Sequence, residues 1–304
     1  MKLPEELQFI ANARMPQQRT DARLDGHTCV ITGATSGVGL AAARRLAWGG
    51  ARLVLVARDE AKAHAVQEEL ASHYQTESEI VLADLTRLDQ VRRAADEILA
   101  RVSRIDLLVN AAGVFCTRST LTPEGYETAF CVNHLAPFLL TRLLLDRVRA
   151  SAPARIIQVS SQGHRFGGLA LDDLAWERRR YRGLQGYGAA KTAQLLTVWT
   201  LAEQLGGSGV TINAVHPGAV KSSIGMNNGL AYRIYKRGFL WWFLKDPAIA
   251  GEAIYYLAAA PEMAAVTGRF FNLTIDERPA PWALDRELGG RVWDVSEQLC
   301  GLRG

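Results

Sequence analysis

Tyr187 and Lys191 lie four residues apart in the stretch YGAAK, within a segment whose composition favours a helix. This spacing places both side chains on one face of a helix, one turn apart. A free phenol has a pKa of about 10 and is a poor acid or base at neutral pH. A neighbouring ammonium favours the phenolate and lowers the pKa of the phenol toward the working range. The pair therefore predicts proton-transfer chemistry, although a Tyr and a Lys at this spacing also occur by chance on solvated helices.

A glycine-rich stretch near the N-terminus, Thr32 to Gly39, supplies a second motif with the sequence TGATSGVG. It follows an apolar run that ends at Ile31 and opens a helical segment over 40–47 that is rich in Ala and Leu. Strand, glycine-rich turn and helix form the setting in which such a loop binds a dinucleotide, because backbone N–H groups and the helix N-terminus approach the pyrophosphate. The residues expected to make this contact are Gly33, Thr35, Ser36, Gly37, Val38 and Gly39.

Together these motifs resemble those of the short-chain dehydrogenase/reductase family, single-domain type, and further matches follow in the family's order over residues 28–222. The resemblance implies a catalytic group of four residues, Asn133, Ser161, Tyr187 and Lys191. It also implies cofactor contacts from the loops after later strands. These are assigned to Asp84, Leu85, Asn110, Ala111, Gly113, Pro217, Gly218, Val220 and Ser222, in addition to Tyr187 and Lys191; Ala111 departs from the Asn usual in the family.

The resemblance further implies a mechanism in which the nicotinamide carries the hydride and the protein handles the proton. Tyr187 would exchange a proton with the carbonyl oxygen, to which Ser161 donates a hydrogen bond. Lys191 would hold the ribose and lower the pKa of the tyrosine, and Asn133 would keep a water in a relay toward solvent. Two alternatives stay open: that Ser160 is the relevant serine, and that Asn133 only caps a helix.

The residue after the second expected strand bears on the choice of cofactor. Relatives that prefer NAD place an acid at the position of Ala57, where it accepts hydrogen bonds from the ribose 2′-hydroxyl. This chain has Arg58 one residue on, and a guanidinium can pair with a 2′-phosphate. We therefore predict NADP(H) rather than NAD(H). Arg58 as an ordinary surface arginine is the alternative, and both the nearby Asp59 and the lack of a basic residue at Ser36 weigh against NADP(H).

Several segments resemble the retinol-dehydrogenase-like branch of the family: HPGAVKSS, the long insert between Ser161 and Tyr187, and the tail WDVSEQLCGL. The segment 230–244, LAYRIYKRGFLWWFL, follows the point where the family has a substrate lid. Its aromatic residues would form an apolar wall and imply a bulky hydrophobic carbonyl or alcohol as substrate. The same segment is also compatible with shallow contact at a membrane surface, or with a helix packed on its own protein.

Other functions stay open at this point. A biosynthetic ketoreductase acting on an aromatic or polyketide intermediate cannot be separated from a lipid or retinoid enzyme by these residues. A catalytically idle scaffold or sensor that binds NADP(H) is disfavoured because Ser161, Tyr187 and Lys191 are all present. A sugar-nucleotide epimerase or dehydratase is disfavoured by the glycine spacing and by the lack of a larger C-terminal domain.

Length and composition predict one α/β domain over residues 1–304, with 48% hydrophobic residues for its core. About seven apolar runs alternate with helical stretches, which predicts a Rossmann-like, doubly wound parallel sheet with helices on both faces. The domain would carry an N-terminal arm (1–25), a substrate lid (221–245) and a C-terminal tail (275–304). The runs are Cys29–Ile31, Leu53–Val56, Ile80–Leu82, Leu107–Val109, Ile156–Val159, Val210–Val215 and Phe270–Leu273, and the tail ends in a helix with apolar positions Leu288, Val292, Val295 and Leu299.

Charge and cysteine usage exclude some function classes. A net charge of +4 gives no case for nucleic acid, and the basic run 178–182 is interpreted as a solvated loop face or an anion site. The four cysteines and six histidines lack metal-ligand spacing, so we expect core cysteines and no metal; His134 and His164 would line the pocket or be structural. We find no secretory signal and no apolar span of about 20 residues, and therefore expect a cytoplasmic protein without a transmembrane segment. A homo-oligomer formed through the helices of Asn133 and Tyr187 is also expected.

Overall fold

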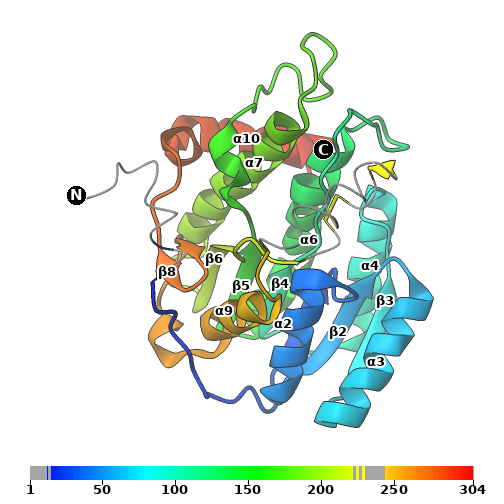
Figure 1. Ribbon diagram of the computed structural model, residues 1–304, viewed down its shortest axis with the longest axis vertical. Coiled ribbons are helices and arrows are strands. Elements are labelled where there is room, and N and C mark those ends of the chain that lie inside the picture. The colour runs from blue at the N-terminus through cyan, green and yellow to red at the C-terminus, as the bar shows by residue number, and fades with distance from the viewer. Residues whose placement is uncertain (1–11, 13–14, 222–223, 226–227, 230–243, 304) are drawn as a thin grey trace.

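The computed structural model describes residues 12, 15–221, 224–225, 228–229 and 244–303. Over these residues the chain forms one eight-stranded sheet with helices on both faces (Figure 1). The strand order is β3-β2-β1-β4-β5-β6-β7-β8, and all neighbouring pairs are parallel except the last. The strands are β1 (Thr28–Thr32), β2 (Arg52–Ala57), β3 (Ser78–Leu82), β4 (Leu107–Asn110), β5 (Ala154–Val159), β6 (Val210–His216), β7 (Phe270–Asn272) and β8 (Ile275–Asp276).

The predicted single-domain, doubly wound fold is confirmed, and the seven apolar runs are the seven parallel strands. The structure adds one short strand that was not predicted, β8, which pairs antiparallel with β7 at the edge of the sheet. The chain reverses between them at Leu273, whose φ of 56° lies in the left-handed region. A strand of two residues is too short to give an apolar pattern, so the sequence carried no signal for it.

Two groups of helices cover the sheet, and each encloses its own apolar core. Successive strand side chains point to opposite faces, so Val54 belongs to one core while Leu53 and Leu55 belong to the other. On the face of Leu53 lie α2 (Gly37–Trp48), α3 (Glu60–Tyr74) and α9 (Ala248–Ala259). On the other face lie α4 (Leu88–Arg101), α6 (Ala136–Ala150) and α7 (Gly183–Gln204), with α10 (Arg286–Leu299) packed outside α7. The short helices are α5 (Thr128–Phe130), the π-helical turn η2 (Cys131–Leu135) and the 3₁₀ turns η3 (Gln162–Phe166), η5 (Pro261–Met263) and η6 (Pro281–Leu284).

Described residues near both ends of the chain pack against the domain. The predicted C-terminal helix is α10, and its inner face buries Val292 and Trp293. Near the N-terminus Leu24 is buried, and the backbone N–H of Gln18 donates to Thr274 Oγ1 at 2.8 Å. The division into arm, lid and tail stays a prediction. The predicted lid and membrane-contact segment lies mostly in 230–243, outside the described residues.

The predictions for the basic run, for the cysteines and for metal binding can be compared with the structure. In the basic run 178–182, Arg178 and Arg179 form ion pairs with Asp172 and Asp173 at 2.8 and 3.0 Å. This neutralisation favours a loop face over an anion site. The four cysteines are buried and free, as expected for core positions. Among the described residues no group of His, Cys, Asp or Glu side chains could hold a metal ion.

One helical stretch among the described residues, Thr128–Ala150, is long and apolar enough to cross a membrane by length and composition. This corrects the expectation that no segment reaches that length. Of its most apolar window, 83% is buried inside the protein, and a core helix passes the same test. Its apolar side chains contact the sheet and α4, which accounts for its composition. A cytoplasmic location stays a prediction.

Candidate active site

In the turn between β1 and α2, backbone segments pack too closely to leave room for a Cβ at two of the glycines. Gly33 has a φ of +71°, and a Cβ there would lie 2.7 Å from the Cα of Ala112. A Cβ at Gly39 would collide with the carbonyl of Gly33. Thr32 ties this turn to the loop after β4, because its Oγ1 accepts hydrogen bonds from the N–H groups of Ala111 and Ala112 at 3.1 Å each. The predicted glycines are therefore fixed by packing.

The first turn of α2 can receive an anion. The helix begins at Gly37, which has a φ of +54°, and its cap residue Ser36 makes no side-chain capping hydrogen bond. The first N–H groups of a helix have no intrahelical acceptor and carry the positive end of the helix dipole. No acidic residue lies in this first turn. The predicted residues Thr35, Ser36, Gly37 and Val38 thus surround a site that fits a pyrophosphate.

Helix α7 presents Tyr187 and Lys191 on one face, as their spacing predicts. The ring of Tyr187 lies over Gly163, where a Cβ would be 2.5 Å from its Cε1, and meets the Phe115 ring edge-on at 5.9 Å between centroids. Lys191 is 2% exposed, and its Nζ donates to the carbonyl of Val159 at 2.8 Å. The tyrosine is half-buried and the lysine lies beneath it.

The charge states of the pair follow from burial. Burial raises the pKa of Tyr187, and a hydrogen bond with Ser161 lowers it by less. Burial also lowers the pKa of Lys191 to about 7. In this structure the pKa of Tyr187 is therefore raised and not lowered as the spacing predicts, and the effect of the ammonium on it stays a prediction. The Nζ of Lys191 lies 5.9 Å from the tyrosine ring centroid and directs hydrogen bonds elsewhere, so desolvation dominates.

Two neighbouring serines follow β5, and their hydroxyl groups have different surroundings. Ser161 lies beside Tyr187 and lowers the pKa of the tyrosine, and its Oγ accepts from the N–H of Gly163 at 3.0 Å. Ser160 is 2% exposed, and its Oγ is buried without a hydrogen-bond partner among the described residues. The alternative in which Ser160 acts is therefore disfavoured.

Asn133 lies in the π-helical turn η2, between α5 and α6. Its Oδ1 accepts from the N–H of Val114 and its Nδ2 donates to the carbonyl of the same residue, both at 2.9 Å. Gly113 allows this contact, since a Cβ there would lie 3.0 Å from the Asn133 Oδ1. Both ends of the amide are thus used to fix the loop after β4, and the alternative of a simple helix cap does not apply. Single π-helical turns within helices are frequent at functional sites.

The expected adenine side lies at the carboxyl ends of β2 and β3. Arg58 follows β2 and is exposed. Asp59 is engaged elsewhere: its carboxylate caps α3 by accepting from the N–H of Lys62 at 3.1 Å and pairs with the lysine ammonium, and these contacts lower its pKa. Asp84 follows β3, with its Oδ1 accepting from the N–H of Thr86 at 3.0 Å, and Leu85 packs against the core.

The remaining predicted contacts follow β4 and β6. Asn110 ends β4 with a buried Oδ1 that has no partner among the described residues, and Ala111 is half-buried. After β6, Pro217 precedes Gly218, whose φ is +80°. Val220 is buried and pairs with Lys245 in an isolated bridge. Ser222 lies outside the described residues. Loops from neighbouring parallel strands meet at one edge of the sheet, which brings these positions together.

Comparison with known proteins identifies the family. The short chain dehydrogenase family matches residues 27–232. The chain belongs to this family. Human retinol dehydrogenase 13 is 38% identical over 302 residues, covering 97% of this chain and 89% of that protein. Mouse retinol dehydrogenase 14 is 36% identical over 292 residues, covering 92% and 87%. A solved structure of an uncharacterized protein from Mycobacterium paratuberculosis superposes with a TM-score of 0.74 at 30% identity, covering 92% of this chain and 95% of that one.

These similarities confirm the retinol-dehydrogenase-like branch of the short-chain dehydrogenases. The protein is therefore an oxidoreductase that acts on CH–OH groups, and its family uses nicotinamide cofactors.

The structure gives His164, which the sequence left as pocket-lining or structural, a structural contact with the serine predicted to be catalytic, and it adds partners that the sequence did not indicate. His164 is buried and its Nδ1 lies 2.7 Å from the carbonyl oxygen of Ser161, while the N–H of Ala280 donates to its Nε2 at 3.1 Å. These two contacts fix the tautomer with the proton on Nδ1. Glu277 accepts a hydrogen bond from Gln162, next to Ser161, at 2.6 Å. Ala280 and Glu277 each lie more than 100 positions from the residue that they contact, so no local motif could have indicated these two partners.

We expect Gly39→Ala to abolish NADPH binding and to lower the free energy of unfolding by roughly 1–3 kcal/mol, because the added methyl collides with the Gly33 carbonyl. Thermal unfolding and NADPH fluorescence titration measure the two effects. Gly290→Ala is the matched control, since a Cβ at that helical position meets nothing within 4 Å. It should leave binding intact and stabilise α10 by about 0.5–1 kcal/mol. Unchanged NADPH affinity in the folded Gly39→Ala protein would contradict the assignment of this turn.

Proposed function

We propose that this protein is an NADP(H)-dependent oxidoreductase that interconverts a carbonyl and a secondary or primary alcohol on a bulky hydrophobic substrate. Tyr187 acts as the general acid and base. The observation that carries the proposal is the arrangement of three side chains: Ser161 and Tyr187 are half-buried and both lie next to Gly163, and Lys191 is buried one turn further along α7. Two polar hydrogens can thus converge on one substrate oxygen.

The charge state of Tyr187 suits reduction. Since burial raises its pKa, the phenol is protonated at neutral pH and can donate to a carbonyl oxygen. Ser161 donates to the same oxygen and stabilises the charge that develops there. Bound nicotinamide supplies the hydride acceptor or donor. In the oxidative direction the tyrosine must lose its proton first, and a charged Lys191 beneath it favours that loss.

The two residues that follow β2 support NADP(H) as the cofactor. Arg58 is exposed there, while the carboxylate of Asp59 is turned to the N-terminus of α3 and neutralised by Lys62. The acid that weighed against NADP(H) is therefore held away by its own contacts. A guanidinium at this position suits a bidentate contact with a 2′-phosphate.

Arg58→Ala is expected to weaken NADPH binding by roughly 10- to 100-fold and to leave NADH binding within about twofold, since hydrogen bonds to charged groups contribute about 1.5–3 kcal/mol. Fluorescence titration of the purified protein with each cofactor measures this difference. Arg93→Ala is the control, because Arg93 is exposed on α4 and, within the described part of the chain, forms an ion pair with Asp89 four residues away. Equal loss for both cofactors, or no loss for either, would remove Arg58 from this role.

A hydrophobic substrate is supported by the ring of Phe115 against Tyr187 and by the names of the relatives, two of which are retinol dehydrogenases. A panel of aldehydes and ketones under NADPH turnover, ranging from short polar ketones to retinaldehyde and aromatic polyketide analogues, tests this choice. Preference for small polar ketones would overturn the hydrophobic substrate. NADPH binding without turnover of any carbonyl would favour the scaffold alternative.

A further inference from the structure

The ammonium of Lys191 lies in a place where a charge is costly. The residue is 2% exposed, on the face of α7 that is turned to the sheet. A buried ammonium is stable only when its hydrogens find acceptors. Two acceptors are present: the carbonyl of Val159 at 2.8 Å and the Oε1 of Gln194 at 3.1 Å. The third hydrogen is left for the site above.

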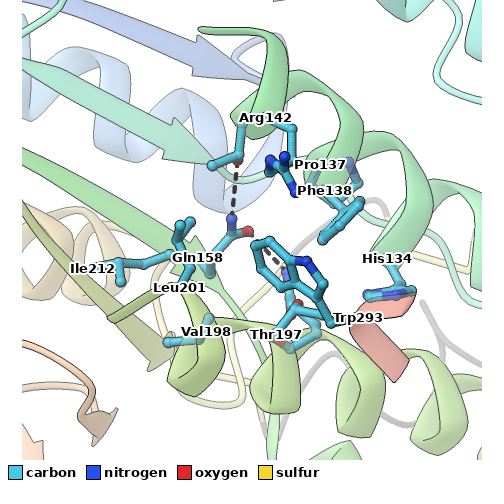
Figure 2. Close-up of a pocket in the computed structure, with 12 residues that line it drawn as sticks. His134, Pro137, Phe138, Arg142, Gln158, Thr197, Val198, Leu201, Ile212 and Trp293 are labelled. Atoms are coloured by element: carbon cyan, nitrogen blue, oxygen red, sulfur yellow. Dashed lines mark hydrogen bonds between the residues drawn. The ribbon is translucent and has the colours of Figure 1, made fainter. Parts of the chain in front are cut away.

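Gln194 is the first of a chain of buried polar side chains behind the lysine. Its Nε2 donates to Gln158 Oε1 on β5 at 3.2 Å, and Gln158 Nε2 lies 3.4 Å from Thr141 Oγ1 on α6. Asn110 Nδ2 on β4 donates to the same Thr141 oxygen at 3.0 Å. Figure 2 shows Gln158 with a hydrogen bond on either side of it. All four residues are 5% exposed or less.

The direction of this chain is determined by the lysine. An ammonium has donors only, so Gln194 must turn its oxygen to Lys191 and its nitrogen to Gln158. The oxygen of Gln158 must then face Gln194, and its nitrogen faces Thr141. Both amides therefore point their negative ends toward Lys191. Aligned hydrogen bonds in a low-dielectric interior polarise one another, which strengthens the acceptor at the end of the chain.

The chain is closed off from solvent. Gln158 and Gln194 border a cavity of about 20 Å³, which is lined on its other sides by His134, Phe138 and Trp293 among others (Figure 2). A cavity of this size holds about one water molecule. Gln158 and Gln194 are 5% and 3% exposed, so the structure offers the side-chain oxygen of Gln194, and not bulk water, as the acceptor.

We propose that Gln194, oriented by Gln158 and Thr141, is a positioning residue that holds the ammonium of Lys191 and keeps it charged beneath Tyr187. This inference rests on the proposed function, in which a charged lysine serves the tyrosine and the ribose. It places Gln194, one turn further along α7, behind the predicted catalytic group as a support for Lys191. It also gives the two buried glutamines a role.

The other groups that face Lys191 do not supply this charge balance. Tyr187, one turn earlier on α7, is protonated and neutral because burial raises its pKa. His134, from η2, has a pKa lowered to about 3 by burial and by the charge of Lys191, so it is neutral too. Burial alone lowers the pKa of Lys191, and among the described residues no carboxylate offsets it. The amide oxygen and the Val159 carbonyl are the groups that oppose desolvation.

The test measures the titration of Lys191 directly. The chain has six lysines, so the ¹³Cε signals of a protein with labelled lysine can be assigned by comparison with Lys191→Arg. The wild-type midpoint is expected near 7. Gln194→Met keeps the length of the side chain but not the acceptor, and should lower the midpoint by roughly one pH unit. Gln194→Glu places a carboxylate at the same distance and should raise it by at least as much.

Three further variants complete the design. Gln158→Met removes the second link and should shift the midpoint in the same direction as Gln194→Met, by less. Thr197→Val is the matched control: it borders the same cavity on α7, but its hydroxyl donates to the carbonyls of Ala193 and Gln194 and not to the chain. It should leave the midpoint unchanged. In Gln194→Asn the shorter side chain does not reach Lys191, so this variant should lower the midpoint as Gln194→Met does. It replaces Gln194→Met in the test if that variant does not fold.

The outcomes separate this inference from the proposed function. Opposite shifts in Gln194→Met and Gln194→Glu support the inference, and the pH profile of kcat/KM under NADPH turnover should move in parallel. The same shifts without turnover of any carbonyl would support the role of Gln194 and overturn the proposed function. An unchanged Lys191 midpoint in both variants would overturn the inference, whatever the activity.

Discussion

Tyr187→Phe is expected to lower kcat for carbonyl reduction by roughly 10²–10⁴-fold, while NADPH affinity stays within about twofold. This is the usual contribution of general acid catalysis, which the variant removes. The ring keeps its packing against Gly163 and Phe115, so the fold of the site should be preserved. Single-turnover kinetics with a hydrophobic aldehyde, together with NADPH titration, measure the two quantities.

Tyr126→Phe is a suitable control for this experiment. Tyr126 is half-buried and its hydroxyl donates to the carbonyl of Leu299 at 2.8 Å, at the end of α10. The variant loses one hydrogen bond, worth about 0.5–1.5 kcal/mol of stability, and should keep its kcat. Full turnover in Tyr187→Phe would show that the proton reaches the substrate oxygen from another donor, and the mechanism proposed here would fall.

Much of the fold was predictable because parallel strands buried on both faces give continuous apolar runs. Leu53–Val56 and Val210–Val215 are such runs. The observed strands are longer by one residue, at both ends of the first run and at the C-terminal end of the second. Strand β8 was missed because two residues carry no pattern.

The site was predictable to the extent that it follows strand ends. Gly33 and Ser161 follow parallel strands and Asn110 is the last residue of one, and such strand ends share one edge of the sheet. Electrostatics were not predictable in the same way. Spacing alone suggested that Lys191 lowers the pKa of Tyr187, whereas in the folded chain burial raises that pKa and Ser161 lowers it by less.

The glutamine chain shows what a sequence can and cannot reveal. Gln158 interrupts the apolar strand RIIQV, and Gln194 interrupts the apolar helix segment TAQLL, so each stands out as a polar residue in a core position. A buried amide requires partners, which is a reason to look for them. The pairing itself joins positions 36 apart on a helix and a strand, and only the folded chain brings them together.

The second large effect concerns the two serines at the end of β5. Ser161→Ala is expected to lower kcat by roughly 10²–10³-fold, since that is the usual loss for one donor to a developing oxyanion. The variant should also raise the pKa of Tyr187, because the hydrogen bond that now lowers it is removed. In the oxidative direction, where the tyrosine must be deprotonated, the rise of kcat with pH should therefore move to higher pH. The measurement is kcat as a function of pH in both directions.

Ser160→Ala is the matched control, one position away on the same strand end. Its Oγ is buried without a partner among the described residues, so removing it deletes an unsatisfied polar group and should leave stability equal or slightly higher. Its kcat should stay within about threefold of the wild type, because the side chain does not contact Tyr187 in the way that Ser161 does. If Ser160→Ala proved the more damaging change, the donor to the substrate oxygen would have to be reassigned, and the turn at Gln162–Phe166 would need to rearrange on binding to expose it. A tenfold or smaller loss in both variants would instead assign most of the oxyanion stabilisation to Tyr187 itself.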